Sequence, residues 1–587
     1  MRTDWNLDNI YTSVNSEEFK KDFEKYKNIV AAFNDWCKDN LKNTEKAKEK
    51  LEKYIELKNE VMSYDRLIMY ANLVQSTDTT NEAVAKAIDA LEGAQAETSY
   101  QDTTIVDFVK ELDNLEEIIN SSNILKEHSF YLSEIKAKGS HTLSPKEEAV
   151  ISKMKNTGSL LWEKQWNQLS STLTVSYNNE EIPLSAARNL AYDKSAEIRK
   201  RAYEAEIKAY SKIEQPAAFC MNGIKGEVIT VAEMHNYKSP LDMTLFDSRI
   251  DGKILDAMFS AVNERLGKLQ EYFLIKAKAL GHKGALPFYD LFAPVAESDK
   301  SYTVEEARDF VLKCFYGFSN DLGDFAKSAF DKCWLDLMPK KGKVGGAYCE
   351  TIHSIGESRI LANFGGAFDD VITIAHELGH AFHNTRLFHL SEINSFYPMP
   401  VAETASTFCE SIVVNEALKS ASDNEKIIIL ENDIMGLTQC IVDIYSRFLF
   451  EDSVFKARKE GILSSEELNG LMLDAQKRAY GKGLDENCLH KYMWVCKPHY
   501  YDADFNYYNF PYAFGALLSK GLYSLYKKMG NDFLPLYDKF LASSSTRPLA
   551  DVAGIAGIDL YSRDFWLTGI DNVIAEIDEL KKMLYNR

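Results

Sequence analysis

Apolar side chains recur at helical spacing over most of this 587-residue chain. Residues 16–120 contain long amphipathic segments, such as FKKDFEKYKNIVAAF, in which apolar positions fall three and four residues apart. Helix starts are marked by a serine or threonine followed three residues later by a glutamate, the pattern of a capping box. These pairs are Ser144 and Glu147, Thr303 and Glu306, and Ser464 and Glu467. The pattern predicts a mainly α-helical protein.

Strand signals are few and short. Residues 172–177 (TLTVSY) are followed by two asparagines and then by residues 181–182, which predicts a β-hairpin. Residues 344–352 (VGGAYCETI) and 358–364 (SRILANF) predict a second, antiparallel pair. The change from hairpin to helix after Ser185 places a domain boundary near residue 200. We therefore expect an N-terminal helical domain, 1–200, and a second domain, 201–587.

Charge and composition narrow the range of partners. The formal net charge is −20, which disfavours binding to nucleic acid because phosphate backbones are also negative. The sequence has no apolar run of 18 residues, and its start, MRTDWNLDNIYTS, lacks the basic and apolar regions of a secretory signal. The nine cysteines are widely spaced and contain no C-x-x-C pair. We expect a cytoplasmic protein with reduced thiols, no membrane association and no obligate protein partner.

One segment carries metal chemistry. Residues 368–383 (FDDVITIAHELGHAFH) contain the motif H-E-x-x-H at positions 376–380. Residues four apart share one helix face, so His376 and His380 can bind the same ion. Glu377 is about 100° further around the helix, where it can activate a water without binding the metal. The alternative is a chance pair of histidines, but burying these groups in an apolar helix is costly without a function.

The start of this helix and its third metal ligand follow from nearby residues. Asp369 or Asp370 is expected to cap the helix. A third histidine in the pattern H-E-x-x-H-x-x-G-x-x-H is excluded, because His383 stands at the glycine position and Arg386 at the last histidine position. His389 is interpreted as a core or surface histidine, as is His383.

A glutamate is therefore the expected third ligand. Glu392 lies in a probable loop and is interpreted as a solvated charge. Glu403 lies 23 residues after His380, in the apolar first turn of a helix that Pro400 opens, and a carboxylate buried there needs a cation. Glu410 is seven residues further on nearly the same face, where it can accept a hydrogen bond from a ligating histidine. Structural polar contacts are the alternative for both.

Four stretches of the sequence resemble a known family of enzymes. They are HELGHAFH, PVAETASTFCE, the longer run SRILANFGGAFDDVITIAHELGHA and, at the start of the chain, WNLDNIYTS. The chain resembles the thimet-oligopeptidase-like metallopeptidases, and most closely their oligoendopeptidase F branch, over essentially its whole length. The resemblance implies a clam-like helical body with a deep central channel and a small sheet beside the zinc helix. It implies one Zn²⁺ on His376, His380 and Glu403, and hydrolysis of internal bonds in short oligopeptides by a catalytic domain, 201–587.

The family also has a segment rich in histidine and tyrosine, which resembles residues 497–515 (KPHYYDADFNYYNFPYAFG). The functional histidine of the family's segment matches His499, and one of its tyrosines matches Tyr512. Tyr508 is a further candidate for a functional tyrosine. Other family tyrosines match less cleanly, because their positions hold Phe505 and Asn509. Aromatic packing between helices is the alternative for most tyrosines of this segment.

These residues suggest a mechanism. Glu377 takes a proton from the attacking water and passes it to the leaving amine, while the zinc ion, Tyr512 and His499 stabilise the oxyanion. Residues 359–364 are expected to form an edge strand to which a peptide adds, or an ordinary core strand. The predicted substrate-binding residues are Leu361, Ala362, Asn363 and Gly365. Competing functions are a non-catalytic peptide-binding module on the same scaffold and a metallocarboxypeptidase.

Overall fold

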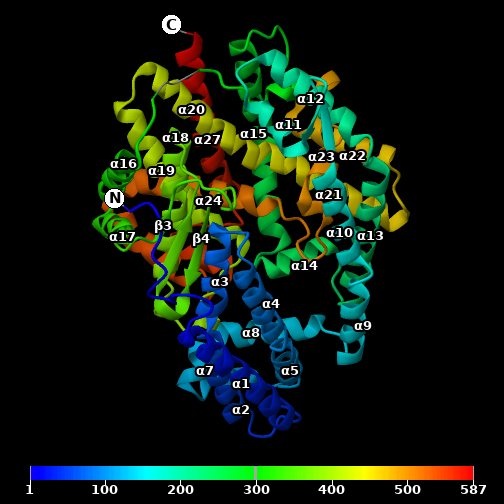
Figure 1. Cartoon of the computed structure of the whole chain (residues 1–587), viewed down its shortest axis with the longest axis vertical. Helices are drawn as coiled ribbons and strands as arrows, with labels where there is room; N and C mark the ends of the chain where they lie inside the picture. The colour runs from blue at the N-terminus through cyan, green and yellow to red at the C-terminus, as the bar shows by residue number, and fades with distance from the viewer. Residues whose placement is uncertain (1, 297–299, 586–587) are drawn as a thin grey trace.

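Helices form most of the structure, which is a computed structural model that describes residues 2–296 and 300–585. The first helices gather at the lower end of the molecule in Figure 1, where the chain is blue. They are α1 (Glu17–Asn40), α2 (Ala47–Met62), α3 (Asp65–Thr77), α4 (Glu82–Ala96), α5 (Ser99–Lys110), α6 (Leu115–Asn120), α7 (Asn123–Glu127) and α8 (Ser129–Lys138). The long amphipathic segments predicted over residues 16–120 are therefore confirmed as helices.

The next helices rise along the right side of the molecule in Figure 1, and the last two of them lie on its left side. They are α9 (Pro145–Lys155), α10 (Ser159–Thr172), α11 (Leu184–Asn189), α12 (Ala196–Tyr210), α13 (Glu214–Met234), α14 (Pro240–Asp247), α15 (Gly252–Ala279), α16 (Val304–Phe318) and α17 (Asn320–Asp331). The capping boxes that open α9 and α16 are formed in both directions, by Ser144 with Glu147 and by Thr303 with Glu306.

The remaining helices follow the three-stranded sheet in the chain. They are α18 (Phe368–Thr385), α19 (Met399–Ser420), α20 (Asp423–Thr438), α21 (Ile444–Glu460), α22 (Ser465–Tyr480), α23 (Met493–Cys496), α24 (Phe510–Met529), α25 (Leu534–Ser543), α26 (Leu549–Ile555) and α27 (Arg563–Tyr585). The predicted capping box of Ser464 and Glu467 opens α22, and Pro400 lies in the first turn of α19 as expected.

Two small sheets confirm the predicted strand regions. The hairpin pairs β1 (Thr174–Tyr177) with β2 (Glu180–Pro183). Its turn residues, Asn178 and Asn179, have φ angles of 52° and 66°, which a two-residue type I′ turn requires. The second sheet contains β3 (Leu335–Asp336), β4 (Tyr348–Ile352) and β5 (Glu357–Leu361), with β4 antiparallel to β5.

The expectation that residues 359–364 form an edge strand is wrong. The strand order is β3-β5-β4, so β5 is central and β4 holds the outer edge. Beyond the end of β5, the amides of Ala362 and Phe364 still donate to the carbonyls of Asp336 and Leu337. Because β3 is only two residues long, it leaves no alternating pattern in the sequence, and its pairing with β5 could not be foreseen.

The sheet lies where the N-terminal helices meet the rest of the protein. One apolar core is built from side chains between Trp5 and Ile135, and it extends to Ile352, Leu361 and Ile393. A larger core begins at Trp166 and includes the buried face of α18. Both β4 and β5 pack on α18, so the sheet supports this helix from one side. The domain boundary at residue 200 stays a prediction.

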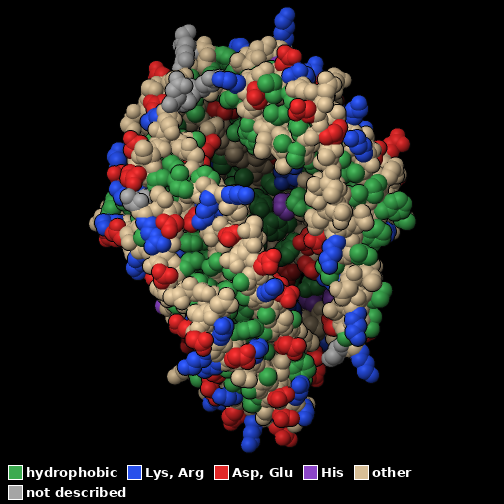
Figure 2. All heavy atoms as spheres, in the orientation of Figure 1, with side chains coloured by type: hydrophobic (Ala, Val, Ile, Leu, Met, Phe, Trp, Pro, Cys, Tyr) green, Lys and Arg blue, Asp and Glu red, His purple; other side chains and the backbone are tan. Residues whose placement is uncertain are grey.

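The face seen in Figure 2 is hollowed near its centre, and acidic and histidine side chains are visible inside the hollow. This shape, the dominance of helices and the small sheet beside α18 confirm the expected clam-like body with a central channel. Among residues 2–296 and 300–585, no helix is long and apolar enough to cross a membrane.

Candidate metal centre

Helix α18 presents the H-E-x-x-H residues, and its N-cap residue is Ala367, so the expected aspartates lie in the first turn and not at the cap position. The Oδ2 atom of Asp370 accepts hydrogen bonds from the amides of Gly365 (2.9 Å) and Ala367 (2.8 Å). Asp369 instead accepts a hydrogen bond from the Asn432 side chain, at 3.0 Å. Asp370 therefore bonds back to the N-cap residue and to the turn before it, which fixes how the chain enters the helix.

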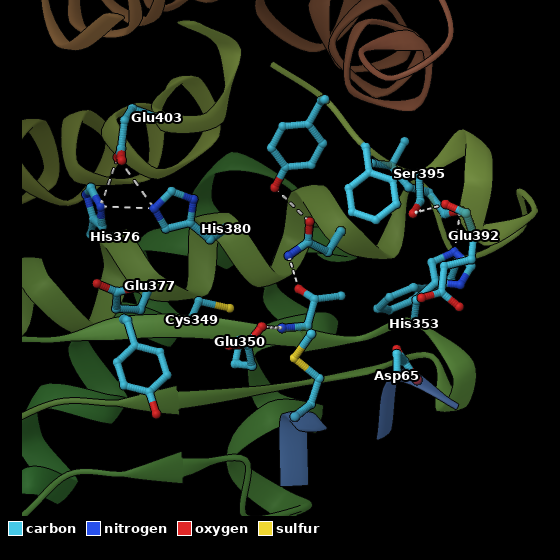
Figure 3. Close-up of a pocket in the computed structure, with 18 of the residues that line it drawn as sticks. Asp65, Cys349, Glu350, His353, His376, Glu377, His380, Glu392, Ser395 and Glu403 are labelled. Atoms are coloured by element: carbon cyan, nitrogen blue, oxygen red, sulfur yellow. Dashed lines mark hydrogen bonds and ion pairs between the residues drawn. The ribbon is translucent and has the colours of Figure 1, made fainter. Parts of the chain in front are cut away.

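Three side chains converge above α18. The Nε2 atoms of His376 and His380 lie 3.2 Å apart. The Oε2 atom of Glu403, from α19, lies 3.3 Å from the His376 nitrogen and 3.4 Å from the His380 nitrogen. Figure 3 shows the carboxylate of Glu403 facing both imidazole rings. Among the described residues, no other group of histidine, cysteine or acidic side chains is arranged to hold a metal ion.

These spacings fit a tetrahedral zinc site. Zinc binds histidine nitrogen and carboxylate oxygen at about 2.0–2.2 Å, and donors at the corners of such a tetrahedron lie about 3.3 Å apart. The nitrogen, nitrogen and oxygen donors here match this separation on all three edges. Three protein ligands leave a fourth position for water or substrate, as in catalytic zinc sites. The site residues thus fit the ion that the motif implies.

Two glycines allow the ligand-bearing helices to approach closely. A Cβ atom on Gly379, in α18, would lie 2.6 Å from the Cα of Ser406, in α19. A Cβ atom on Gly515, in α24, would lie 3.1 Å from the Cβ of Glu403. Because neither glycine has a side chain, α19 lies between α18 and α24 with Glu403 within reach of the histidines.

Hydrogen bonds orient two of the three candidate ligands, His376 and Glu403. The Nδ1 atom of His376 lies 2.5 Å from Oε1 of Glu410, and the hydroxyl of Ser406 donates to Oε2 of Glu403 at 3.1 Å. Burial opposes the charged forms, but hydrogen bonding overcomes it: contacts with Glu403 and Glu410 raise the pKa of His376 well above its ordinary value. Contacts with both histidines hold the pKa of Glu403 well below its ordinary value. The site therefore favours an anionic Glu403 beside a positive charge.

Glu377 lies between the ligand group and the sheet strand that carries Cys349 (Figure 3). It is 5% exposed, and this burial raises the pKa of its carboxyl group. It lines a cavity of about 530 Å³ together with His376, His380 and Glu403. A carboxylate with a raised pKa, beside a metal site and open to a cavity, can accept and return a proton.

The outer edge of β4 forms one wall of this cavity, through residues 348–351. Among the described residues, no further strand pairs with that edge. Asp65, Glu350 and Glu392 also line the cavity, and Figure 3 shows Asp65 and Glu392 at the end away from His376 and His380. Glu392 is half-buried in the cavity lining, so it differs from the solvated loop charge expected from the sequence; burial and the nearby Asp65 raise its pKa to about 9.

The predicted substrate-binding residues lie behind this wall. Leu361 and Ala362 are buried at the end of β5, and neither they nor the other two predicted residues line the cavity. The amide of Asn363 donates to the carbonyls of Val344 (3.0 Å) and Gly346 (2.9 Å), just before β4. These residues support the loop and strand that face the cavity. The sequence indicated the sheet but not which strand lay outermost.

The three candidates from the histidine and tyrosine segment form a series of neighbouring rings. The ring centres of His499 and Tyr508 are 5.2 Å apart, and those of Tyr508 and Tyr512 are 5.6 Å apart. Tyr512 lines a second cavity, of about 450 Å³, together with His376 and Glu403. Burial and two nearby cations lower the pKa of His499 to about 4, so its imidazole is neutral at pH 7. Tyr512 is thus the member of the series placed beside the metal ligands.

Other aromatic and histidine side chains serve the core. Tyr507 packs between Phe448 and Phe455 with its hydroxyl 3.3 Å from Asp452, and Tyr501 stacks on Trp166. The completely buried His383 bonds to the Ser544 hydroxyl, whereas His389 is exposed on the surface. These placements confirm the interpretation of both histidines as core or surface residues, and that of most tyrosines as packing.

Comparisons with known proteins agree with this arrangement. A model for Oligopeptidase F matches residues 111–174, and a model for Peptidase family M3 matches residues 189–572. Oligopeptidase PepF of Bacillus subtilis is 26% identical over 604 residues, which cover 99% of this chain and 87% of that protein.

Solved structures share the fold along almost the whole chain. A chain from Chlamydophila abortus superposes with a TM-score of 0.84 at 22% identity, covering 99% of this chain and 98% of its own. Oligoendopeptidase F from Enterococcus faecium superposes with a TM-score of 0.71 at 17% identity, covering 97% and 100%. The resemblance noted in the sequence is thereby confirmed. The chain belongs to peptidase family M3 and is a metallo-endopeptidase.

Proposed function

We propose that this protein is a zinc-dependent endopeptidase that hydrolyses internal bonds of short oligopeptides. The observation that carries the proposal is the spacing of the three donor atoms of His376, His380 and Glu403, which are 3.2–3.4 Å apart beside a cavity of about 530 Å³. A cavity of this size inside a channel admits an extended peptide but not a folded domain. This favours oligopeptides as the substrate class.

A zinc ion bound here would supply Lewis acidity toward the peptide carbonyl and a place for the attacking water. Glu377 removes a proton from that water and delivers it to the leaving amine, a role that its raised pKa suits. The phenol of Tyr512, which lines the cavity with His376 and Glu403, donates a hydrogen bond to the developing oxyanion. His499 and Tyr508 continue the series behind it and orient the phenol.

The substrate backbone is proposed to pair with the outer edge of β4, at residues 348–350. Main-chain pairing tolerates varied side chains, which suits a peptidase that acts on many sequences. Leu361 contributes by pairing with Tyr348 of β4. Ala362 and Asn363 contribute by fixing the segment before β4, because the Ala362 carbonyl accepts a hydrogen bond from Lys343 and the Asn363 side chain donates to the Val344 carbonyl. Gly365 contributes through its amide, which bonds to Asp370 at the start of α18.

The test compares Glu377→Gln and Glu403→Ala with the wild-type protein on a fluorogenic oligopeptide, while bound zinc is measured by elemental analysis. We expect Glu377→Gln to keep stoichiometric zinc and lose about 100- to 10,000-fold in turnover. Glu403→Ala is expected to lose zinc as well as activity.

Glu416→Gln is the matched control, because Glu416 lies on α19 with its carboxylate bonded to Lys419 at the surface. It should leave zinc content and turnover unchanged. Full cleavage by Glu377→Gln, or stoichiometric zinc in Glu403→Ala, would refute the corresponding assignment.

A further inference from the structure

A network of buried polar side chains lies beside the segment that carries Tyr508. It joins Lys225 of α13 and Glu451 of α21 to the loop of residues 502–509, which comes directly before α24. Helices α13 and α21 pack on each other, and α21 also packs on α24 (Figure 1). Lys225 is 0% exposed and Glu451 is 1% exposed. Neither side chain takes part in the proposed peptidase chemistry.

Two asparagines of the loop bind this ion pair. The ammonium group of Lys225 donates to Oε1 of Glu451 at 2.8 Å and to Oδ1 of Asn506 at 3.0 Å. The side-chain amide of Asn509 donates to Oε2 of Glu451 at 2.8 Å. Both asparagines are buried. A single ion pair therefore holds the loop at two points that are three residues apart.

Asn509 also begins α24. It is the N-cap residue of this helix, and its Oδ1 atom accepts a hydrogen bond from the amide of Phe510 at 2.6 Å. Its backbone carbonyl accepts a hydrogen bond from the amide of Tyr512 at 3.1 Å. The side chain of Asn509 thus links Glu451 directly to the first turn of α24, which carries Tyr512.

The loop is bent into a conformation that needs support. Tyr507 has a φ angle of 52°, in the left-handed region that a bulky residue rarely adopts. Such conformations persist only where the surrounding structure holds them. The two anchors, Asn506 and Asn509, lie on either side of Tyr507. Between them Tyr508 is half-buried while its neighbours in the chain are buried, and its ring joins the series that ends at Tyr512.

Stability alone does not explain a charged network at this place. Taking a lysine and a glutamate out of water has a desolvation cost that their attraction often fails to repay, and apolar side chains of similar size are often equally stable. Hydrogen bonds require defined distances and angles, whereas apolar contacts are non-directional. The polar network therefore determines where the backbone of the loop lies, and with it the placement of the tyrosines.

We propose that the Lys225–Glu451 pair and Asn509 are positioning residues for the peptidase reaction. They hold the phenol of Tyr512, and the ring of Tyr508 that orients it, at the place where the oxyanion forms. This inference rests on the proposed function and deepens it. None of the three residues lines either cavity at the metal ligands, so they act through the tyrosines. A displacement of about 1 Å at a reacting group can cost about 100-fold in rate.

The experiment reverses the direction of one hydrogen bond. In Asn509→Asp the new carboxylate still caps α24, but its second oxygen faces Oε2 of Glu451, and the two negative groups repel each other. In Glu451→Gln the side-chain amide has one acceptor oxygen for two donors, Lys225 and Asn509, so one of them loses its partner. In the double variant, the new amide at position 451 donates to the new carboxylate at position 509 and still accepts from Lys225. The charge and the hydrogen bonds of the network are then restored.

Steady-state kinetics on one fluorogenic oligopeptide give kcat and KM, and zinc content and thermal unfolding are measured for each variant. Both single variants are expected to lose about 10- to 100-fold in kcat, with KM and zinc content unchanged. The double variant is expected to return to within about threefold of the wild-type kcat. Asn81→Asp is the matched control, because Asn81 caps α4 among the N-terminal helices with the same kind of hydrogen bond. It should keep the wild-type kinetics.

A second comparison separates positioning from a general loss of structure. In Tyr512→Phe the hydroxyl that the network positions is absent. Adding Asn509→Asp to this variant should therefore cost no more than about a further threefold in kcat. A substitution that merely loosened the fold would instead multiply its loss with that of Tyr512→Phe.

The outcomes separate the two proposals. The positioning role would be overturned by wild-type kcat in both single variants, by a folded double variant that does not recover, or by fully multiplied losses with Tyr512→Phe. Single variants that unfold and lose zinc would assign the network to folding, and full turnover in Tyr512→Phe would leave nothing to position; both results also overturn the inference while the peptidase stands. Failure of the wild-type protein to cleave the peptide would instead refute the proposed function.

Discussion

Gly379 lies directly against the backbone of Ser406, so that a Cβ atom at position 379 would come within 2.6 Å of the Ser406 Cα and 2.7 Å of the Ala405 carbonyl oxygen. This contact joins α18, which carries both histidines, to α19, which carries Glu403. The glycine of H-E-L-G-H thus has a structural role in bringing the third ligand to the first two.

Replacing this glycine tests the contact. Gly379→Ala is expected to push α18 and α19 apart, lowering the free energy of unfolding by about 1–3 kcal/mol through overpacking and weakening zinc binding. Urea denaturation and a competitive zinc titration measure the two effects. Gly267→Ala, on α15, is the control, because a Cβ there meets nothing within 4 Å and alanine favours a helix. Equal zinc affinity in the two variants would contradict the proposed role.

Glu410 is expected to act on zinc affinity through His376. Its Oε1 atom, 2.5 Å from Nδ1 of His376, fixes the ring so that Nε2 faces the other donors. Glu410→Ala should weaken zinc binding by about 10- to 100-fold, as loss of such a partner typically does. The measurement is a zinc titration against a chelator of known affinity. Glu416→Ala, on the same helix, should bind zinc as tightly as the wild-type protein.

The two tyrosines Tyr512 and Tyr507 should respond differently to the same change. Tyr512→Phe removes a hydroxyl beside the metal ligands and is expected to lower kcat by about 100- to 1000-fold with little change in KM. Tyr507→Phe removes a hydroxyl that faces Asp452, away from that cavity, and should keep nearly full kcat. Steady-state kinetics on one oligopeptide measure kcat and KM for both variants. A larger loss in Tyr507→Phe would reverse the assignment.

Glu392 is expected to make stability depend on pH. Its pKa is about 9 in the folded protein against 4.5 as the ordinary value, so the unfolded chain loses the proton first as pH rises. The ionisation of Glu392 therefore does not destabilise the folded protein below about pH 4.5, and the destabilisation grows as the pH rises to about 9. Glu392→Gln should raise the free energy of unfolding at pH 7 by about 1–3 kcal/mol, and by less at pH 5.

Chemical denaturation at pH 5 and pH 7 measures the difference in the free energy of unfolding between Glu392→Gln and wild type. The control is Glu460→Gln, because Glu460 is exposed on the surface. A constant difference between Glu392→Gln and wild type across this range would show that the carboxyl group is already solvated in the folded state.

Features that depend on neighbours along the chain were predictable from sequence. The helical period alone puts His376 and His380 on one face of α18, and the capping pairs alone mark where α9, α16 and α22 begin. Glu403 followed from the absence of a third histidine at the expected spacing, together with the apolar turn around it. These inferences need only the geometry of one helix.

Other features were decided by contacts between distant segments. The two residues of β3 pair with a strand some 25 positions later and turn the expected edge strand into a central one. Glu392 is half-buried and lines the cavity together with Asp65 of the N-terminal helices, and Tyr512 rather than Tyr507 reaches the site because of how α24 packs on α19. The sequence by itself determined the metal motif and the helices that carry it. Only the tertiary structure decided which strand, carboxyl group and tyrosine face the cavity, because burial and pairing across the chain leave no local periodic signal.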